Sequence, residues 1–96
     1  GSAVASIPLK DSIRSVDHSG NQQEDRNQFR LIQTPQTFQL RLIKKAFEQP
    51  YNTSFTDDAS VLEAAGHAVH LIEGNYKNIK ITTPEDLLIA QSFLNV

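Results

Sequence analysis

The segment NIKITTPED, at residues 78–86, constrains the fold more than any other stretch, because it predicts a strand that leads directly into a helix. In its first half, Ile79 and Ile81 alternate with polar residues, as on one face of a short strand. Thr83 can cap a helix N-terminus, and Pro84 suits the first helical position. Two acidic residues follow in the first turn, where negative charge is favourable.

The rest of the sequence predicts an extended N-terminal arm followed by helices and strands. The arm consists of two extended segments around a polar turn, and such a ribbon needs a partner surface to be stable. We expect the last helix to be packed on two sides, because apolar residues occupy more than one of its faces. In chain order the expected elements are extended segments at 5–16 and 27–33 around a turn at 18–26, a helix from Thr34–Pro35 to Pro50, a helix from Thr56 to Gly66, strands at 67–73 and 78–82, and a helix at 84–94. These elements define the α/β class, with an incomplete sheet.

Composition and charge exclude several classes of protein. The 96 residues suffice for one small domain at most, and the hydrophobic content of 39% is lean for a chain that must build its own core. A net charge of −2 disfavours a nucleic-acid-binding protein, because such proteins are usually basic. No apolar run approaches the ~18 residues that span a membrane. The absence of cysteine is compatible with the cytoplasm, which is the compartment we expect.

Lys80 stands at the end of the expected strand, just before the helix start. A cation in that position, beside the free amides of a helix N-terminus, is well placed to bind a phosphate group. The alternative is an ordinary solvated lysine near a strand end, and its position alone does not separate the two interpretations.

Other segments, together with Lys80, resemble the C-terminal part of the 2-C-methyl-D-erythritol 4-phosphate cytidylyltransferase family. They are PLKDSI at 8–13, Arg26, QTPQTF at 33–38 and TDDAS at 56–60, in this order, and the resemblance extends over about residues 7–94. It implies the C-terminal part of a Rossmann-like nucleotidyltransferase fold, with a β-hairpin arm, short strands and three helices. It also implies a dimerisation arm at residues 1–34 and the C-terminal α/β portion of the domain at 35–96.

The resemblance implies a homodimeric enzyme that transfers a cytidylyl group from CTP to 2-C-methyl-D-erythritol 4-phosphate in non-mevalonate isoprenoid biosynthesis. Members of the family are more than twice as long as this chain, and the Gly-rich loop with which they grip CTP is absent here. We therefore expect a fragment that is inactive alone. Two alternatives remain open: a ribitol 5-phosphate cytidylyltransferase with the same chemistry, and a non-catalytic module that dimerises by exchanging its arm.

Four residues are assigned to substrate binding by the resemblance. Lys80 matches a lysine that contacts the substrate phosphate, and Arg26 matches an arginine that reaches the same phosphate from the partner's arm. Both are expected to be catalytic, because fixed positive charge stabilises the charge that builds up during phosphoryl transfer. Thr34 matches a threonine near the substrate, although helix capping is the main role we favour for it. Ser12 stands where relatives carry a threonine, so it keeps the hydroxyl group and loses a methyl group.

Asp57 and Asp58 form the one acidic pair that invites a metal site. Adjacent residues at a helix start do not face each other, so capping is the better explanation for this pair. The resemblance implies that the full-length enzyme uses Mg²⁺, held with the nucleotide triphosphate outside this segment. We therefore expect no strong metal site in this chain.

Overall fold

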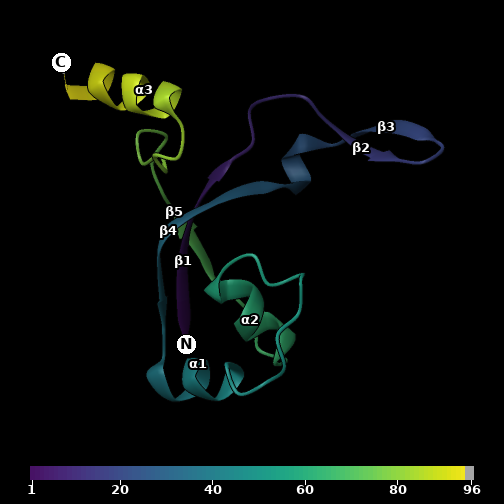
Figure 1. Ribbon diagram of the computed structural model, residues 1–96, viewed down its shortest axis with the longest axis vertical. Coiled ribbons are helices and arrows are strands. Elements are labelled where there is room, and N and C mark those ends of the chain that lie inside the picture. The colour runs from purple at the N-terminus through teal and green to yellow at the C-terminus, as the bar shows by residue number, and fades with distance from the viewer. Residues whose placement is uncertain (95–96) are drawn as a thin grey trace.

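The computed structural model describes residues 1–94, which form an α/β structure of two small sheets, three α-helices and one 3-10 helix (Figure 1). The elements are β1 (Ser2–Pro8), β2 (Ile13–Asp17), β3 (Gly20–Glu24), η1 (Arg26–Gln28), β4 (Arg30–Phe38), α1 (Leu40–Ala46), α2 (Asp58–Ala64), β5 (Leu71–Glu73) and α3 (Pro84–Leu94). The α/β class and the three helices predicted from the sequence are confirmed.

Strand β1 is the centre of the larger sheet. It pairs antiparallel with β4 along one edge and parallel with β5 along the other. Four consecutive residues of β1 are buried: Val4, Ala5, Ser6 and Ile7. Consecutive buried residues are typical of a strand that is covered on both faces. In the order β4-β1-β5, the strands β4 and β5 are the edges of this sheet within residues 1–94, and β4 carries the candidate residue Thr34.

A small apolar core joins α1 and α2. Its buried members are Ala46 of α1 with Val61 and Leu62 of α2. Partly buried hydrophobic side chains surround them: Phe38, Leu42, Ile43, Phe55 and Val69. Leu62 is 1% exposed, so this core depends strongly on a single leucine.

The start of α2 agrees with the prediction. Asp57 is the N-cap and accepts a hydrogen bond from the backbone N–H of Ser60 at 2.8 Å, while the Ser60 hydroxyl accepts one from the Asp57 N–H at 3.2 Å. Gly66, with a φ of +93°, follows the helix in a conformation that glycine adopts without strain. The capping interpretation of Asp57 is thus confirmed.

Strands β2 and β3 form a hairpin that projects away from the central sheet (Figure 1). In its turn, Asp17 accepts hydrogen bonds from the hydroxyl and the backbone N–H of Ser19 at 2.7 and 2.9 Å. These bonds, the hydroxyl's first, lower the pKa of the Asp17 carboxyl. A hairpin is present, but it is not the predicted one: β3 lies at Gly20–Glu24, within the range 18–26 that was predicted to be a turn, and it is β3 that pairs with β2. The predicted extended segments are also interrupted, because β1 ends at Pro8 and η1 separates β3 from β4.

The prediction that Thr34 and Pro35 begin a helix is wrong. Both residues lie within β4, where the pairing with β1 is irregular between Val4 and Ser6. Proline is tolerated at such a place, because an irregularity in an edge strand does not require its missing N–H. The helix begins later, at Leu40. Thr34 is therefore not an N-cap.

The prediction of a strand at 78–82 is also wrong, and the strand predicted at 67–73 is shorter than expected. In that second range only Leu71–Glu73 forms a strand, β5, which pairs with β1. Residues 78–82 have alternating hydrophobicity, but they form no backbone ladder with any strand of residues 1–94. Their place in the fold is set by side-chain hydrogen bonds, as described below.

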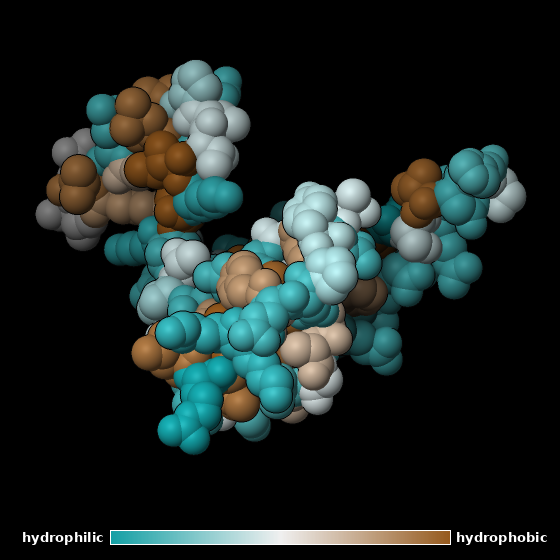
Figure 2. All heavy atoms as spheres, turned by 60° about the horizontal axis from the view of Figure 1, so that its bottom comes forward, coloured by the Kyte–Doolittle hydropathy of each residue, from teal (hydrophilic) through white to brown (hydrophobic). Residues whose placement is uncertain are grey.

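Helix α3 begins as predicted but is packed differently. Thr83 and Asp86 form a reciprocal cap, with hydrogen bonds of 3.2 Å from the Asp86 N–H to the Thr83 hydroxyl and 3.0 Å from the Thr83 N–H to the Asp86 carboxylate. None of the helix's residues is buried, and Figure 2 shows its apolar side chains on the surface. The expected packing on two sides is absent within residues 1–94.

Candidate functional site

An open hollow lies between β4, the start of α2 and the segment that follows β5. Its volume is about 630 Å³, and its lining includes both Thr34 and Lys80. The other lining residues are Ile7, Leu31, Ile32, Gln33, Gln36, Thr56, Asp57, Tyr76, Asn78 and Ile79. The structure thus brings two of the four predicted site residues to one hollow, which we call the Lys80 hollow.

Lys80 differs from the cations nearby, because each of those has a partner. The Lys10 ammonium lies 4.0 Å from the centre of the Tyr76 ring, and Arg30 pairs with Glu73 at 2.6 Å. Lys80 makes no ion pair, cation–π contact or side-chain hydrogen bond with any of residues 1–94. Its charge is therefore available to an anionic ligand in the hollow.

The carboxylate on the opposite wall is already satisfied. Asp57 caps α2 through one oxygen, and its other oxygen accepts a hydrogen bond from the Gln36 side-chain amide at 3.2 Å. The Gln36 carbonyl oxygen in turn accepts the N–H of Ala59 at 3.2 Å, so Gln36 connects β4 with α2. This carboxylate is fixed by structural hydrogen bonds, and it is not paired with Lys80.

Two of the backbone amides that follow Lys80 are occupied. One carboxylate oxygen of Asp86 accepts hydrogen bonds from the N–H of Thr82, the Thr82 hydroxyl and the Thr83 N–H, each at 3.0 Å. These bonds, with the Thr82 backbone first, lower the pKa of the Asp86 carboxyl. The prediction of free amides beside Lys80 is thus partly wrong, because the N–H groups of Thr82 and Thr83 donate to Asp86. The available positive charge in the hollow comes from the lysine side chain.

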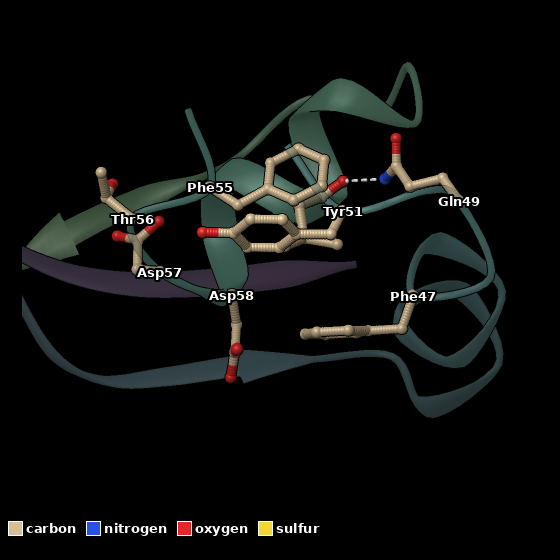
Figure 3. A pocket seen from close by; sticks show the side chains of 8 residues that line it. Phe47, Gln49, Tyr51, Phe55, Thr56, Asp57 and Asp58 are labelled. Atoms are coloured by element: carbon tan, nitrogen blue, oxygen red, sulfur yellow. Dashed lines mark hydrogen bonds between the residues drawn. The ribbon is translucent and has the colours of Figure 1, made fainter. Parts of the chain in front are cut away.

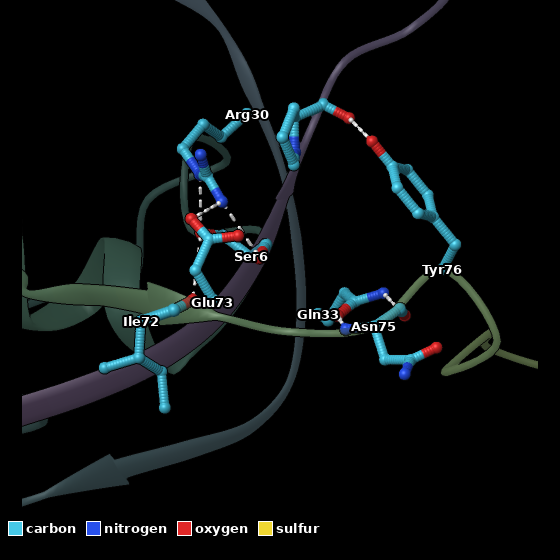
Figure 4. Close-up of polar contacts among 8 residues, drawn as sticks. Ser6, Arg30, Gln33, Ile72, Glu73, Asn75 and Tyr76 are labelled. Carbon is cyan, nitrogen blue, oxygen red and sulfur yellow. Dashed lines mark hydrogen bonds and ion pairs between the residues drawn. The ribbon is translucent and has the colours of Figure 1, made fainter.

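The segment that carries Lys80 is tied to β4 by side chains (Figure 4). The Gln33 amide donates hydrogen bonds to the carbonyl oxygens of Asn75 and Asn78 at 2.8 and 2.9 Å, and its own oxygen accepts the Asn75 N–H at 3.3 Å. The Asn78 side chain donates to the backbone oxygen of Thr34. The Tyr76 hydroxyl donates to the Pro8 oxygen at 3.2 Å. These bonds replace the ladder that the predicted strand would have provided.

A second polar cluster holds the three strands of the central sheet together (Figure 4). Arg30 on β4 donates to the hydroxyl and the backbone oxygen of Ser6 at 2.8 and 3.2 Å, besides its ion pair with Glu73 on β5. The Ser6 hydroxyl donates to the Ile72 oxygen at 3.2 Å. The buried serine of β1 is therefore satisfied, and this cluster supports the sheet from which the hollow is built.

Ser12 and Arg26 share a different hollow, in the arm. It has a volume of about 280 Å³ and is also lined by Gln23, Glu24, Asp25 and Asn27. Arg26 donates a hydrogen bond to the backbone oxygen of Lys10, which orients the guanidinium group without neutralising it. The four predicted site residues thus fall into two pairs, Thr34 with Lys80 and Ser12 with Arg26, which line two separate hollows of one copy.

Sequence reasoning missed two kinds of residue at the Lys80 hollow. Thr56 lines the hollow with its side chain exposed, although the sequence pattern indicated only a place in a helix start. Gln33 and Asn78 organise the Lys80 segment, and no local pattern marks them, because their partners are more than 40 residues away. Only a prediction of which segments lie side by side could have found them.

A separate hollow beside α1 and α2 has aromatic walls (Figure 3). Tyr51 and Phe55 meet edge to face, with ring centres 6.4 Å apart, and Phe47 lies across from them. Asp57 and Asp58 contribute the charged groups of its lining. Carboxylates without a cation repel a phosphate, so this aromatic hollow does not suit an anionic substrate.

Residues 1–94 offer neither a gathered group of metal ligands nor a helix suited to span a membrane. No three His, Asp or Glu side chains there are gathered in an arrangement that could hold a metal ion. The Asp57 carboxylate at the Lys80 hollow already accepts hydrogen bonds on both oxygens, from the Ser60 N–H and from the Gln36 amide. None of the helices in this range has the length and apolar character needed to cross a membrane.

Comparison with known proteins gives consistent matches over the whole chain. Residues 1–96 match the family model described as IspD: 2-C-methyl-D-erythritol 4-phosphate cytidylyltransferase. A protein of that description from Bacteroides fragilis is 50% identical over 93 residues, which cover 94% of this chain and 42% of the relative. One from Bacillus cytotoxicus is 44% identical and covers 100% of this chain and 44% of the relative.

Solved structures agree with these matches. The crystal structure of 2-C-methyl-D-erythritol 4-phosphate cytidylyltransferase from Thermus thermophilus superposes with a TM-score of 0.81 at 32% identity, over 100% of this chain and 49% of that one. The structure of the bifunctional IspDF from Campylobacter jejuni superposes with a TM-score of 0.73 at 31% identity, over 92% of this chain and 22% of that one. The fold therefore corresponds to part of a nucleotidyltransferase, as expected from the sequence. The chain spans less than half the length of the curated relatives it matches.

Proposed function

Because the chain belongs to the 2-C-methyl-D-erythritol 4-phosphate cytidylyltransferase family, we propose that the full-length protein transfers a cytidylyl group from CTP to 2-C-methyl-D-erythritol 4-phosphate. The products are 4-diphosphocytidyl-2-C-methyl-D-erythritol and pyrophosphate, in non-mevalonate isoprenoid biosynthesis. The observation that carries this proposal is the Lys80 side chain, which has no partner within residues 1–94 and lines an open hollow beside Thr34 and Thr56. We expect the reaction to take place in the cytoplasm.

The proposed reaction is a direct displacement. An oxygen of the substrate's phosphate attacks the α-phosphorus of CTP, a new phosphorus–oxygen bond forms, and the bond to pyrophosphate breaks. The attacking phosphate and the triphosphate are both anionic, so they repel each other. Lys80 offsets this repulsion and stabilises the charge at the transferred phosphorus, while Thr34 and Thr56 offer hydroxyl groups to the polyol phosphate. No covalent intermediate with the protein is required.

The complete substrate site is proposed to form between two copies. Within the expected arm at residues 1–34, the part that projects is the β2–β3 hairpin, and the hollow at its base is lined by Arg26 and Ser12. In the homodimer, Arg26 of the partner subunit reaches the phosphate that Lys80 binds. A guanidinium suits this task because its planar donors can bind two phosphate oxygens at once.

The nucleotide is proposed to bind mainly outside this segment. No Gly-rich phosphate loop occurs in the sequence, and residues 1–94 offer no ligand set for Mg²⁺. The ion that the family is expected to use with CTP would therefore be held elsewhere in the full-length enzyme. For the same reason we expect the isolated chain to show no cytidylyl transfer.

The test is an assay of pyrophosphate release by the full-length enzyme with 2-C-methyl-D-erythritol 4-phosphate and, in parallel, with ribitol 5-phosphate. The proposal predicts turnover with the first acceptor and much less with the second. Preference for ribitol 5-phosphate would assign the sister activity. A lack of turnover with both, in a full-length protein that dimerises as its concentration rises, would favour the non-catalytic dimerisation module.

Substitution of the two cations tests their roles. Lys80→Ala and Arg26→Ala are each expected to lower turnover about a hundredfold or more, because each removes a fixed charge that stabilises the transition state. Lys44→Ala and Arg41→Ala are matched controls, since both residues are exposed on α1 and line neither the Lys80 hollow nor the arm hollow. Near-normal kinetics for Lys80→Ala or Arg26→Ala would remove that residue from the site.

A further inference from the structure

We propose that Gln33 is a positioning residue, which holds the backbone of 75–78 against β4 so that Lys80 stays directed at the hollow. The inference rests on the proposed function of Lys80, and it adds a residue that does not itself need to touch the substrate. Gln33 lies on β4 and is half-buried, so its side chain reaches the segment from a fixed strand.

Gln33 connects both ends of a tight turn in the Lys80 segment. Its amide nitrogen donates to the Asn75 oxygen, and its oxygen accepts the Asn75 N–H (Figure 4). The same nitrogen also donates to the Asn78 oxygen. The same turn is closed by a backbone hydrogen bond of 3.0 Å from the Asn78 N–H to the Asn75 oxygen. The side chain of Gln33 therefore uses both its nitrogen and its oxygen on one turn, and it fixes that turn to the central sheet.

Lys80 depends on this anchor because little else holds its backbone. No hydrogen bond from residues 1–94 reaches the backbone groups of Lys80 or Ile81. On one side Ile79 has only a local bond, from its N–H to the Lys77 oxygen at 3.0 Å, and Asn78 is the nearest residue bonded to β4. On the other side the nearest fixed point is Thr82, bonded to Asp86. A lysine two residues beyond a fixed turn is well placed only while that turn stays in position.

Gly74 shows how closely the segment is fitted to Gln33. A Cβ atom at Gly74 would overlap the side-chain oxygen of Gln33 and would lie 3.3 Å from the Ser6 oxygen. The Gly74 N–H donates to that Ser6 oxygen at 2.7 Å, so the backbone cannot retreat without losing a bond of the sheet. The substitution Gly74→Ala would therefore displace the Gln33 amide while leaving its chemistry unchanged.

The kinetic test uses the full-length enzyme with Gln33→Leu, which keeps a side chain of similar size and removes the three hydrogen bonds. Displacement of a catalytic group by about 1 Å can cost up to about a hundredfold in rate, so we expect kcat/KM for the polyol phosphate to fall about tenfold or more. The KM for CTP should change little. Gly74→Ala should reproduce the loss. Gln49→Leu is the matched control, because Gln49 also bonds a backbone oxygen, that of Val61 at 2.8 Å, but lines the aromatic hollow and not the Lys80 hollow.

A double substitution separates positioning from a general structural effect. If Gln33 acts through Lys80, Gln33→Leu should lower the residual activity of Lys80→Ala by no more than about twofold, because the group to be positioned is gone. A further tenfold loss in that background, or unchanged kinetics for Gln33→Leu alone in an active enzyme, would overturn the inference.

Hydrogen exchange tests the anchor independently of activity. In Gln33→Leu the Asn75 amide should lose protection and the peptide covering 74–82 should exchange faster, whereas Gln49→Leu should leave that peptide unchanged. Unaltered exchange in Gln33→Leu would show that Gln33 does not hold the segment. If the wild-type enzyme turned over neither acceptor, the proposed function would fail, and this measurement would still decide whether the anchor exists.

Discussion

Helices α2 and α3 begin with the same kind of cap, but α2 is packed in a core and α3 is exposed. Both begin with a reciprocal cap between an N-cap residue and a residue three positions later, Asp57 with Ser60 and Thr83 with Asp86. The 7-residue α2 buries Ala59, Val61 and Leu62, whereas no residue of the 11-residue α3 is buried. The cap fixes where a helix begins, but it contributes nothing to what covers the helix.

The chain therefore has two parts that are stabilised differently: α1 and α2 share an apolar core, whereas α3 and the Lys80 segment are held mainly by polar contacts. Around α2, buried side chains of α1 and α2, with the partly buried Phe38 of β4, stabilise the structure. Around α3 and the Lys80 segment, order comes from hydrogen bonds such as those of Gln33 and Asp86. The proposed catalytic lysine lies in the second part, where contacts with the rest of a longer protein, or with a second copy, can adjust its position.

The largest effect on stability should come from the α2 core. Leu62→Ala removes a fully buried side chain and should cost about 2–5 kcal/mol of unfolding free energy, through lost burial and a cavity. Leu88→Ala on α3, where the side chain is 66% exposed, should stay within about 0.5 kcal/mol in the same isolated chain. Urea denaturation followed by circular dichroism measures both. Similar losses for the two variants would remove the contrast between the helices.

The caps should show a smaller difference. Asp57→Ala should lower the free energy of unfolding by about 1 kcal/mol, because α2 is part of the cooperative core and also loses the bond to Gln36. Thr83→Ala should fray α3 without moving the main denaturation midpoint. Amide exchange of each helix, compared with the global transition, distinguishes the outcomes. Equal shifts of the midpoint would mean that α3 unfolds together with the core.

The smallest effect should be a pH dependence confined to α3. Hydrogen bonds, from the Thr82 N–H first, hold the pKa of the Asp86 carboxyl below its ordinary value of 3.8. The unfolded chain therefore takes up the proton first as the pH falls. The stabilisation by Asp86 is complete above pH 3.8 and is lost as the pH drops through the lower pKa of the folded state.

Amide NMR shifts of Thr82 and Thr83 during acid titration measure this effect. They should move with a midpoint below pH 3.8, and Asp86→Asn should abolish the movement. A midpoint above that value would contradict the proposed hydrogen-bond arrangement. The hairpin turn offers an internal comparison, because Ser19 lowers the pKa of Asp17 by the same means.

Local signals in the sequence were sufficient for the starts of α2 and α3 but insufficient for the start of α1 and for the sheet. Capping at Asp57 and Thr83 depends on residues three positions apart, so it can be predicted without knowing the fold. Thr34 and Pro35 carry the same kind of signal, but pairing between β1 and β4 places them in an edge strand. The alternation of apolar and polar residues at 78–82 predicted a strand wrongly for a related reason. A strand requires backbone pairing with a neighbour, and this segment is joined to β4 through side chains instead.

The candidate site shows the same division. Lys80 and Thr34 could be proposed from the family resemblance, and the structure places both in one hollow. The roles of Gln33 and Asn78 could not be predicted, because each bonds a segment more than 40 residues away. Whether Ser12 and Arg26 join the site depends on a second copy, which the sequence of one chain describes only through its resemblance to relatives.

Mixing two inactive full-length variants tests the shared site most directly. If Lys80 and Arg26 serve each phosphate from different subunits, mixed dimers of Lys80→Ala and Arg26→Ala contain one site with both cations intact. Random exchange of subunits should then restore about a quarter of wild-type turnover, because half of the dimers are mixed and each has one working site. No recovery, with subunit exchange verified, would show that both cations act within one copy and would contradict the account.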